Sequence, residues 1–235
     1  MLTIKTKKSN HFLVSVALTF AIVLYPSRSN AQQLQQGISV QLPPASGAAA
    51  MPAADNENAW IVTVTPDGSL FFGTNKVTAA SLVEEMKTHP RLREQKLYIK
   101  ADARAPYASV EKALAAAHVD LFEDSVLLTN QLGSSEPGTI VSPKGLEVLL
   151  VPPAGAQPVE VQLSHSGEHT STLKVNNRQI PIANLQNMLT QIFQNHPEKV
   201  VLLKADAQLP VADVVHVIDA CHSTGAQVIL PTPQL

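Results

Sequence analysis

Two aspartates stand where a carboxylate could do chemistry. Asp102 and Asp206 each end a short apolar run, and each precedes a proline, Pro106 or Pro210, by four residues. A carboxylate between a strand and a proline-initiated helix can act in catalysis, or it can accept hydrogen bonds from loop and helix N–H groups. A general acid or base needs a second convergent group, and no such pair accompanies both aspartates. We therefore expect a structural role for them.

Histidines suggest two further clusters. The segment His165–His169 holds two imidazoles and a carboxylate, but a hairpin loop lacks the helical i, i+4 spacing of zinc motifs, which favours a solvated turn. Cys221 and His222 lie near His216, yet residues 216 and 222 point to different sides of one helix. Cys221 is expected to be a small buried residue. The sequence thus predicts neither a metal site nor a cofactor.

Composition excludes other classes of function. The chain has 235 residues, of which 45% are hydrophobic and 4% aromatic, so no stacking platform for nucleic acid is expected. No Gly-x-Ser-x-Gly elbow, Gly-rich phosphate loop or Cys-x-x-Cys pair occurs. A hydrolase that uses Asp206 and His222 is the weakest hypothesis. Cys221 is the single cysteine, so no disulfide can form within the chain. We expect a protein that is not an enzyme.

The N-terminus reads as an export signal. Lys5, Lys7 and Lys8 precede an apolar run from Phe12 to Tyr25, and Ser29-Asn30-Ala31 places small residues around a signal-peptidase site. The run is short for a membrane span of about 20 residues, so both a cleaved signal and an uncleaved anchor remain open. In both cases the remainder is exported. Without residues 1–31, 13 basic and 19 acidic residues give a net charge of −6, which argues against nucleic acid and anionic lipid as partners.

The exported part contains an internal duplication. Lys-Ala-Asp-Ala at residues 100–103 recurs at 204–207, and Pro106 is matched by Pro210 at the same spacing of 104. A lead-in segment is also repeated, because Gly37–Leu42 resembles Gly145–Leu150. Two copies are too few for a solenoid, which needs about three or more repeats. The pattern therefore predicts two tandem modules.

Each module is expected to fold as ββαβαβ. The first module has short apolar strands and an Asp67-Gly68 turn that supplies positive φ angles. Its first helix begins at Thr78, and its second helix has Pro106 at the first position. These features indicate a two-layer α/β sandwich, with a sheet on one side and two helices on the other. Stretches rich in Pro, Gly, Ala and Ser at 43–58 and 132–144 predict linkers. The expected divisions are 1–31 (signal or anchor), 32–58 (lead-in and linker), 59–130 (first module), 131–157 (lead-in and linker) and 158–235 (second module).

The order of these features resembles the ExbD/TolR family of biopolymer transport proteins. The resemblance rests on a hydrophobic N-terminus followed by Gln35–Ala45, Pro66–Gly68, Ile99–Asp102 and Pro106-Tyr107. It covers residues 35–129, and residues 145–231 as a diverged second copy. It implies a subunit of a TonB- or Tol-type energy-transduction complex in the bacterial cell envelope. Its expected partners are an ExbB/TolQ-like membrane protein or a TonB-like protein, if the chain is anchored, and further copies of itself. The candidates for a structural or an interaction role are Asp102, Pro106, Tyr107, Asp206 and Pro210.

The chain departs from the family at the residue that carries the proton. In the family an Asp in the membrane helix has this role, because an intramembrane carboxylate is costly and is kept for function. Residues His11 to Tyr25 contain neither Asp nor Glu. A subunit without this carboxylate cannot run the same proton cycle. Two hypotheses therefore stand: an anchored ExbD-like component that works by protein–protein contact, and a cleaved, soluble periplasmic binding or scaffolding protein without a motor role.

Overall fold

The computed structural model describes residues 38–89, 94–120, 122–131, 142–167, 171–196 and 198–232. The predicted N-terminal hydrophobic segment and His169 lie outside these residues. Within them, no helix is long and apolar enough to cross a membrane. Residues 32–235 form one compact unit, to which both modules belong.

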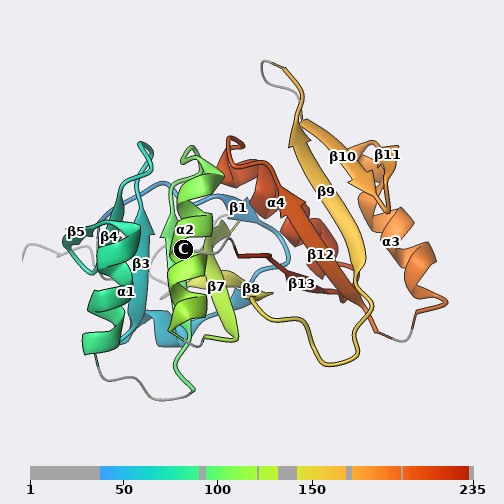
Figure 1. Cartoon of the computed structure of the whole chain (residues 1–235). Coiled ribbons are helices and arrows are strands. Elements are labelled where there is room, and N and C mark those ends of the chain that lie inside the picture. Colours follow the sequence, from blue (N-terminus) through green and yellow to red (C-terminus); the bar gives the residue numbers. More distant parts are fainter. Residues whose placement is uncertain are drawn as a thin grey trace, which may run out of the picture. The chain divides into compact units, whose positions relative to one another are not determined.

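The first module consists of five strands and two helices (Figure 1). They are β3 (Trp60–Val64), β4 (Leu70–Phe72), β5 (Asn75–Val77), α1 (Ala79–Thr88), β6 (Leu97–Ala101), α2 (Tyr107–Val119) and β7 (Asp124–Gln131). Strands β3, β6 and β7 are parallel, and β4 and β5 extend the sheet in antiparallel fashion. Helices α1 and α2 cover one face of this sheet.

The second module repeats this plan. Its elements are β9 (Val159–His165), β10 (Ser171–Val175), β11 (Arg178–Ile180), the 3₁₀ turn η2 (Ile182–Asn184), α3 (Leu185–Phe193), β12 (Val200–Ala205), α4 (Val211–His222) and β13 (Gln227–Ile229). The predicted two-layer α/β fold is thus confirmed, but each module has one strand more than predicted. β5 and β11 were missed because they have only three residues each and directly follow tight turns.

A single strand joins the two modules into one sheet. The order is β11-β10-β9-β12-β13-β8-β7-β6-β3-β4-β5, in which β8 (Lys144–Leu149) lies between the last strands of the modules. β8 makes six antiparallel residue pairs with β7 and meets β13 in parallel at Leu149 and Ile229. The second lead-in, which follows the predicted linker 132–144, therefore forms a strand of this sheet.

The first lead-in adopts a different structure from the second despite their similar sequences. Residues 38–43 have no regular structure and are followed by β1 (Pro44–Ala45), β2 (Ala49–Ala50) and the 3₁₀ turn η1 (Pro52–Asp55). β1 pairs with β7, and β2 pairs with the start of β8. The segment 43–58, predicted as a linker, is thus packed against the sheet.

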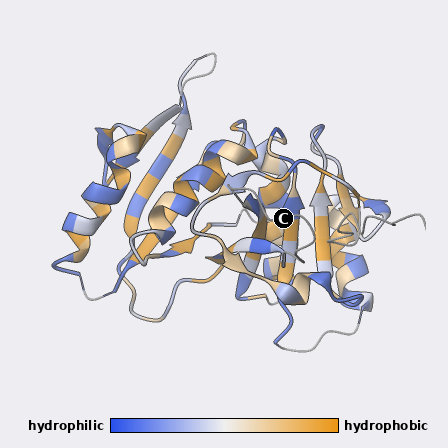
Figure 2. Ribbon diagram, turned by 180° about the vertical axis from the view of Figure 1, so that it is seen from behind, coloured by the Kyte–Doolittle hydropathy of each residue, from blue (hydrophilic) through white to orange (hydrophobic). Residues whose placement is uncertain are grey.

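The first lead-in covers an apolar face of the first module, whereas β9 of the second module is polar on this face. Ile61, Tyr98 and Val126 form a small cluster on the sheet face opposite the helices, together with Ala54 from the lead-in. In the second module the corresponding face of β9 carries Glu160 and polar neighbours, and blue and orange bands alternate along this strand in Figure 2. Alternation of this kind is typical of a sheet with one solvated face. The outer face of β9 is therefore solvated, whereas the outer face of the first module is covered.

The hairpin turns of the two modules differ in their residues. In the turn between β3 and β4, Gly68 has a positive φ of +80° and Asp67 does not, which corrects the prediction that Asp67 shares this role. A side chain at Gly68 would have its Cβ 2.6 Å from Ser109 Oγ, so the turn packs against the start of α2. In the turn between β4 and β5, Gly73 has a positive φ of +59°. The equivalent turn between β10 and β11 has Asn176 and Asn177, both with positive φ, as expected for a two-residue type I′ turn.

Candidate functional site: the contact between the modules

The two repeated loops pair with each other through their backbones. Tyr107 N donates to Leu209 O at 2.8 Å, and the equivalent Val211 N donates to Ala105 O at 2.9 Å. Ala108 N donates to Ala207 O, and its equivalent Ala212 N donates to Ala103 O, both at 2.9 Å. In each pair of bonds, the second donor lies 104 residues after the first donor, and the second acceptor lies 104 residues before the first acceptor. The contact therefore has approximate two-fold symmetry.

The prolines that mark the repeat lie at the centre of this contact. Pro106 and Pro210 face each other as an antiparallel bridge. Both occupy the N-cap position of their helices, with φ −67° and −61°, one residue earlier than the predicted first helical position. The extended ψ of each proline directs the following N–H groups across to the other module. Helix N-terminal N–H groups, which lack partners within their own helix, are satisfied here by the other module.

The first helical residues after these prolines are buried. Tyr107 has 2% of its surface exposed and Val211 also 2%. Burial, with a smaller effect of the nearby Glu111 carboxylate, raises the pKa of Tyr107. Sequence reasoning named Tyr107 through a family motif, and the structure places it beside a bond between the modules. Together with Pro106 and Pro210, it lies at the contact itself.

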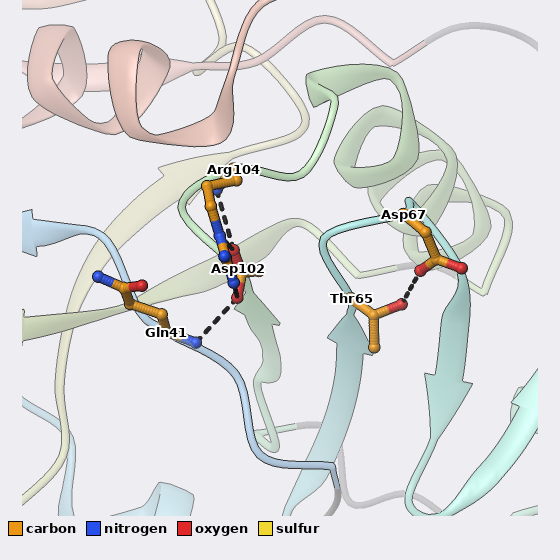
Figure 3. Close-up of polar contacts among 5 residues, drawn as sticks. All are labelled: Gln41, Thr65, Asp67, Asp102 and Arg104. Atoms are coloured by element: carbon orange, nitrogen blue, oxygen red, sulfur yellow. Dashed lines mark hydrogen bonds and ion pairs between the residues drawn. The ribbon is translucent and has the colours of Figure 1, made fainter.

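Asp102 ties the first lead-in to the loop before α2 (Figure 3). Its carboxylate accepts hydrogen bonds from the backbone N–H of Gln41 at 3.0 Å and from the Arg104 guanidinium at 2.9 and 3.1 Å. Ala103 N in turn donates to Gln41 O at 2.8 Å. The carboxylate is 1% exposed, whereas Arg104 is largely exposed. Asp102 therefore holds loops together, and its charge is balanced by Arg104.

Asp102 should make the stability of the protein depend on pH. The side-chain hydrogen bonds from Arg104 are the main cause that lowers the pKa of Asp102 to about 2. Together with the backbone hydrogen bonds from Gln41 and Arg104, they outweigh burial, which alone would raise this pKa. Since the carboxyl titrates near 3.9 when unfolded, it stabilises the fold by about 2 kcal/mol above about pH 4. This contribution is lost as the pH falls from about 4 to about 2.

The Asp102→Asn variant should reveal this contribution. It should have a lower free energy of unfolding at about pH 7 and a flatter pH dependence below about pH 4. Urea unfolding of the purified full-length chain at several pH values measures both. Glu84→Gln, a change at an exposed carboxylate on α1, serves as control and should keep the wild-type profile. A profile for Asp102→Asn that runs parallel to the wild type would contradict this role.

Asp206 has a simpler environment than Asp102. Its carboxylate accepts the backbone N–H of His165 at 3.0 Å, and the equivalent of Arg104 is Gln208. Its negative charge adds to the effect of burial in raising the pKa of Glu111, which belongs to the first module. Asp206 precedes α4 and His222 ends it, about 17 Å further along the helix axis. The proposed hydrolase pair is therefore not brought together.

Two grooves of the described surface lie away from this contact. Groups of three or more metal-binding side chains do not occur among the described residues. One groove of about 340 Å³ lies beside Trp60 and Tyr98, and another of about 420 Å³ lies at the edge of β10 and β11. Neither groove is lined by any of the five candidate residues.

Two further residues hold the modules together and were missed by sequence reasoning. Gly145 in β8 lies so close to β7 that a Cβ would be 2.4 Å from Val126 Cγ1. Asp219 on α4 accepts hydrogen bonds from Ser46 and Gly47 of the first lead-in. The sequence offers one signal for Asp219, which stands where the first copy has Ala115. A buried acid in place of alanine indicates a contact made by one copy only.

Cys221 should be unreactive in the folded protein. The side chain is completely buried, and burial raises the pKa of its thiol to about 12. Thiol reagents attack the thiolate, so both access and ionisation are suppressed. Mass analysis after exposure to a maleimide at about pH 8 should show no adduct on the native chain and one adduct after unfolding. Rapid modification of the native chain would show that α4 does not pack as described.

The site and the fold define a duplicated two-layer α/β protein whose repeated motif forms a contact between modules. The family model of the biopolymer transport protein ExbD/TolR matches residues 14–132 and 137–233. The chain therefore belongs to the ExbD/TolR family, whose members are non-enzymatic cell-envelope components of TonB- and Tol-type energy transduction. A comparison with curated proteins gives no match.

Proposed function

We propose that the protein is an anchored subunit of a TonB- or Tol-type energy-transduction complex and acts by protein–protein contact. The observation that carries this proposal is the extent of the family match, which begins at residue 14, inside the apolar run Phe12–Tyr25. The match thus includes the segment that would anchor the chain as well as both modules. In this role an ExbB/TolQ-like protein lies beside the anchor, and a TonB-like protein contacts the exported modules.

The structure supports a role for two modules acting together. The reciprocal bonds between residues 103–108 and 207–212 and the strand β8 join them within one compact unit. One chain thereby presents two related modules to a partner in a defined arrangement. The sequence His11–Tyr25 has no carboxylate, so in this proposal the protein does not carry the proton.

Co-purification from membranes tests this proposal. A C-terminal affinity tag on the full-length chain should recover a polytopic inner-membrane protein after mild solubilisation, together with the tagged chain. The matched control is the same chain with residues 1–31 replaced by a cleavable signal peptide, which should recover the modules without that partner. Recovery of the tagged chain alone, from membranes in which it is abundant, would contradict the proposal.

A soluble periplasmic binding or scaffolding protein is the second candidate. It is favoured by the short apolar run, which suits a signal peptide better than a span of about 20 residues, and by the missing carboxylate. In this case Ala31 would be the last residue removed, and the joined modules would act free of the membrane.

A further inference from the structure

The first lead-in is fastened to both modules over a short distance. Residues 41–47, here called the strap, begin at Gln41, whose N–H binds the carboxylate of Asp102 in the first module. They end at Gly47, whose N–H binds the carboxylate of Asp219 in the second module at 2.8 Å. Between these points Asn130 N donates to Pro43 O at 2.9 Å.

The end of the strap at the second module is closely fitted. Asp219 accepts three hydrogen bonds, from Ser46 N at 2.9 Å, Ser46 Oγ at 2.8 Å and Gly47 N at 2.8 Å. Burial alone would raise the pKa of Asp219, but these hydrogen bonds outweigh it and leave the pKa lowered. A Cβ on Gly47 would lie 3.1 Å from Asp219 Oδ1, so a glycine suits this close approach.

This fastening is not a consequence of the repeat. The position equivalent to Asp219 in α2 is Ala115, which cannot accept such hydrogen bonds. In the second copy, the segment equivalent to the strap begins at Leu149, the last residue of β8, and its residues 151–155 are exposed. The second module therefore has an acid at the position where the lead-in of the first module passes its helix, and the first module has none there.

We propose that the strap ties the N-terminal segment to both modules at once, with Asp219 as the positioning residue that engages the second module. The chain reaches the strap directly from residues 1–37, so a displacement of the N-terminal segment acts on both modules together. Asp219 gives the strap a direct attachment to the second module, in addition to the indirect one through β8 and the bonds between the modules. This inference rests on the proposed function, because it describes how an anchored subunit transmits a displacement.

Hydrogen exchange of the purified full-length chain tests whether the strap is one unit. In Asp219→Asn, loss of hydrogen bonds to a charged acceptor should speed exchange at Ser46 and Gly47 by about tenfold or more. If the strap acts as a unit, the amides of Gln41 and Ala103 at its other end should also exchange faster. Asp213→Asn, a change at a carboxylate on the same helix, is the control and should leave all four amides at wild-type rates.

The reciprocal variant completes the test. Asp102→Asn should speed exchange at Gln41 and also at Ser46 and Gly47, while the core of α4 stays protected in both variants. Acceleration confined to the mutated end would show two separate contacts and overturn the inference, as would unchanged rates throughout. No partner is present in these measurements, so a failure to find an inner-membrane partner would remove the proposed function and leave this result standing.

Discussion

Replacing Gly145 with valine should destabilise the protein by about 3 kcal/mol or more. The first side-chain carbon would lie 2.4 Å from Val126 Cγ1 and 3.1 Å from Leu127 O, and the second of these atoms belongs to the backbone of β7. β8 would have to move away from β7, and the six residue pairs between these strands would be disturbed. Since β8 lies between the modules in the sheet, their arrangement should loosen as well.

Denaturant unfolding of the full-length chain, combined with hydrogen exchange in β8, measures this effect. Lys144→Val, at the neighbouring position of the same strand, is the control, because its half-buried side chain already occupies space there. It should change the free energy of unfolding by less than about 1 kcal/mol. Equal stability of Gly145→Val and wild type would mean that β8 does not pack against β7 as described.

Replacing Tyr107 with alanine should have the second large effect, a loss of about 3–5 kcal/mol. The ring is 2% exposed at the start of α2, so its removal leaves a cavity in the core next to the bond between Tyr107 N and Leu209 O. The equivalent change Val211→Ala removes a smaller buried side chain and should cost about 1–2 kcal/mol. Both variants weaken the region in which the modules pair.

Tyr107→Phe separates the packing of the ring from its hydroxyl group. This variant keeps the ring and should remain within about 1 kcal/mol of the wild type. Urea unfolding of the three variants, followed by far-UV circular dichroism, gives the comparison. A small effect of Tyr107→Ala, similar to that of an exposed position, would show that the start of α2 is not part of the core.

The fold was largely predictable because it depends on local patterns. The strand beginning at Trp60, the helix capped by Thr78 and the helices after Pro106 and Pro210 follow from apolar periodicity and from residues with strong positional preferences. Thr78 forms the expected cap, with its side chain accepting from Ser81 N. Short strands such as β5 carry too few residues for a periodic signal.

The arrangement of the modules was not predictable, because similar sequences adopt different structures in it. Gly37–Leu42 resembles Gly145–Leu150, yet residues 145–149 form the strand β8 and residues 38–42 do not form a strand. The sheet has a single strand position between β7 and β13, and one of the two lead-ins occupies it. Which lead-in fills it depends on contacts far apart in sequence, such as that of Gly145 with β7.

The candidate residues were found through the repeat, but their roles came from their partners. The sequence showed that Asp102 and Asp206 are equivalent, whereas the structure shows that Asp102 binds Gln41 and Arg104 and that Asp206 binds His165 N. Asp219 escaped notice because a single acid on a helix carries no motif. Its importance depends on Ser46, which lies 173 residues earlier in the chain.

The most direct test of the proposed anchored subunit is the intact mass of the native protein recovered separately from membrane and periplasmic fractions. We expect a full-length species beginning at Met1 in the membrane fraction. A soluble chain beginning near Gln32 would contradict it and would instead identify a released protein of two joined modules.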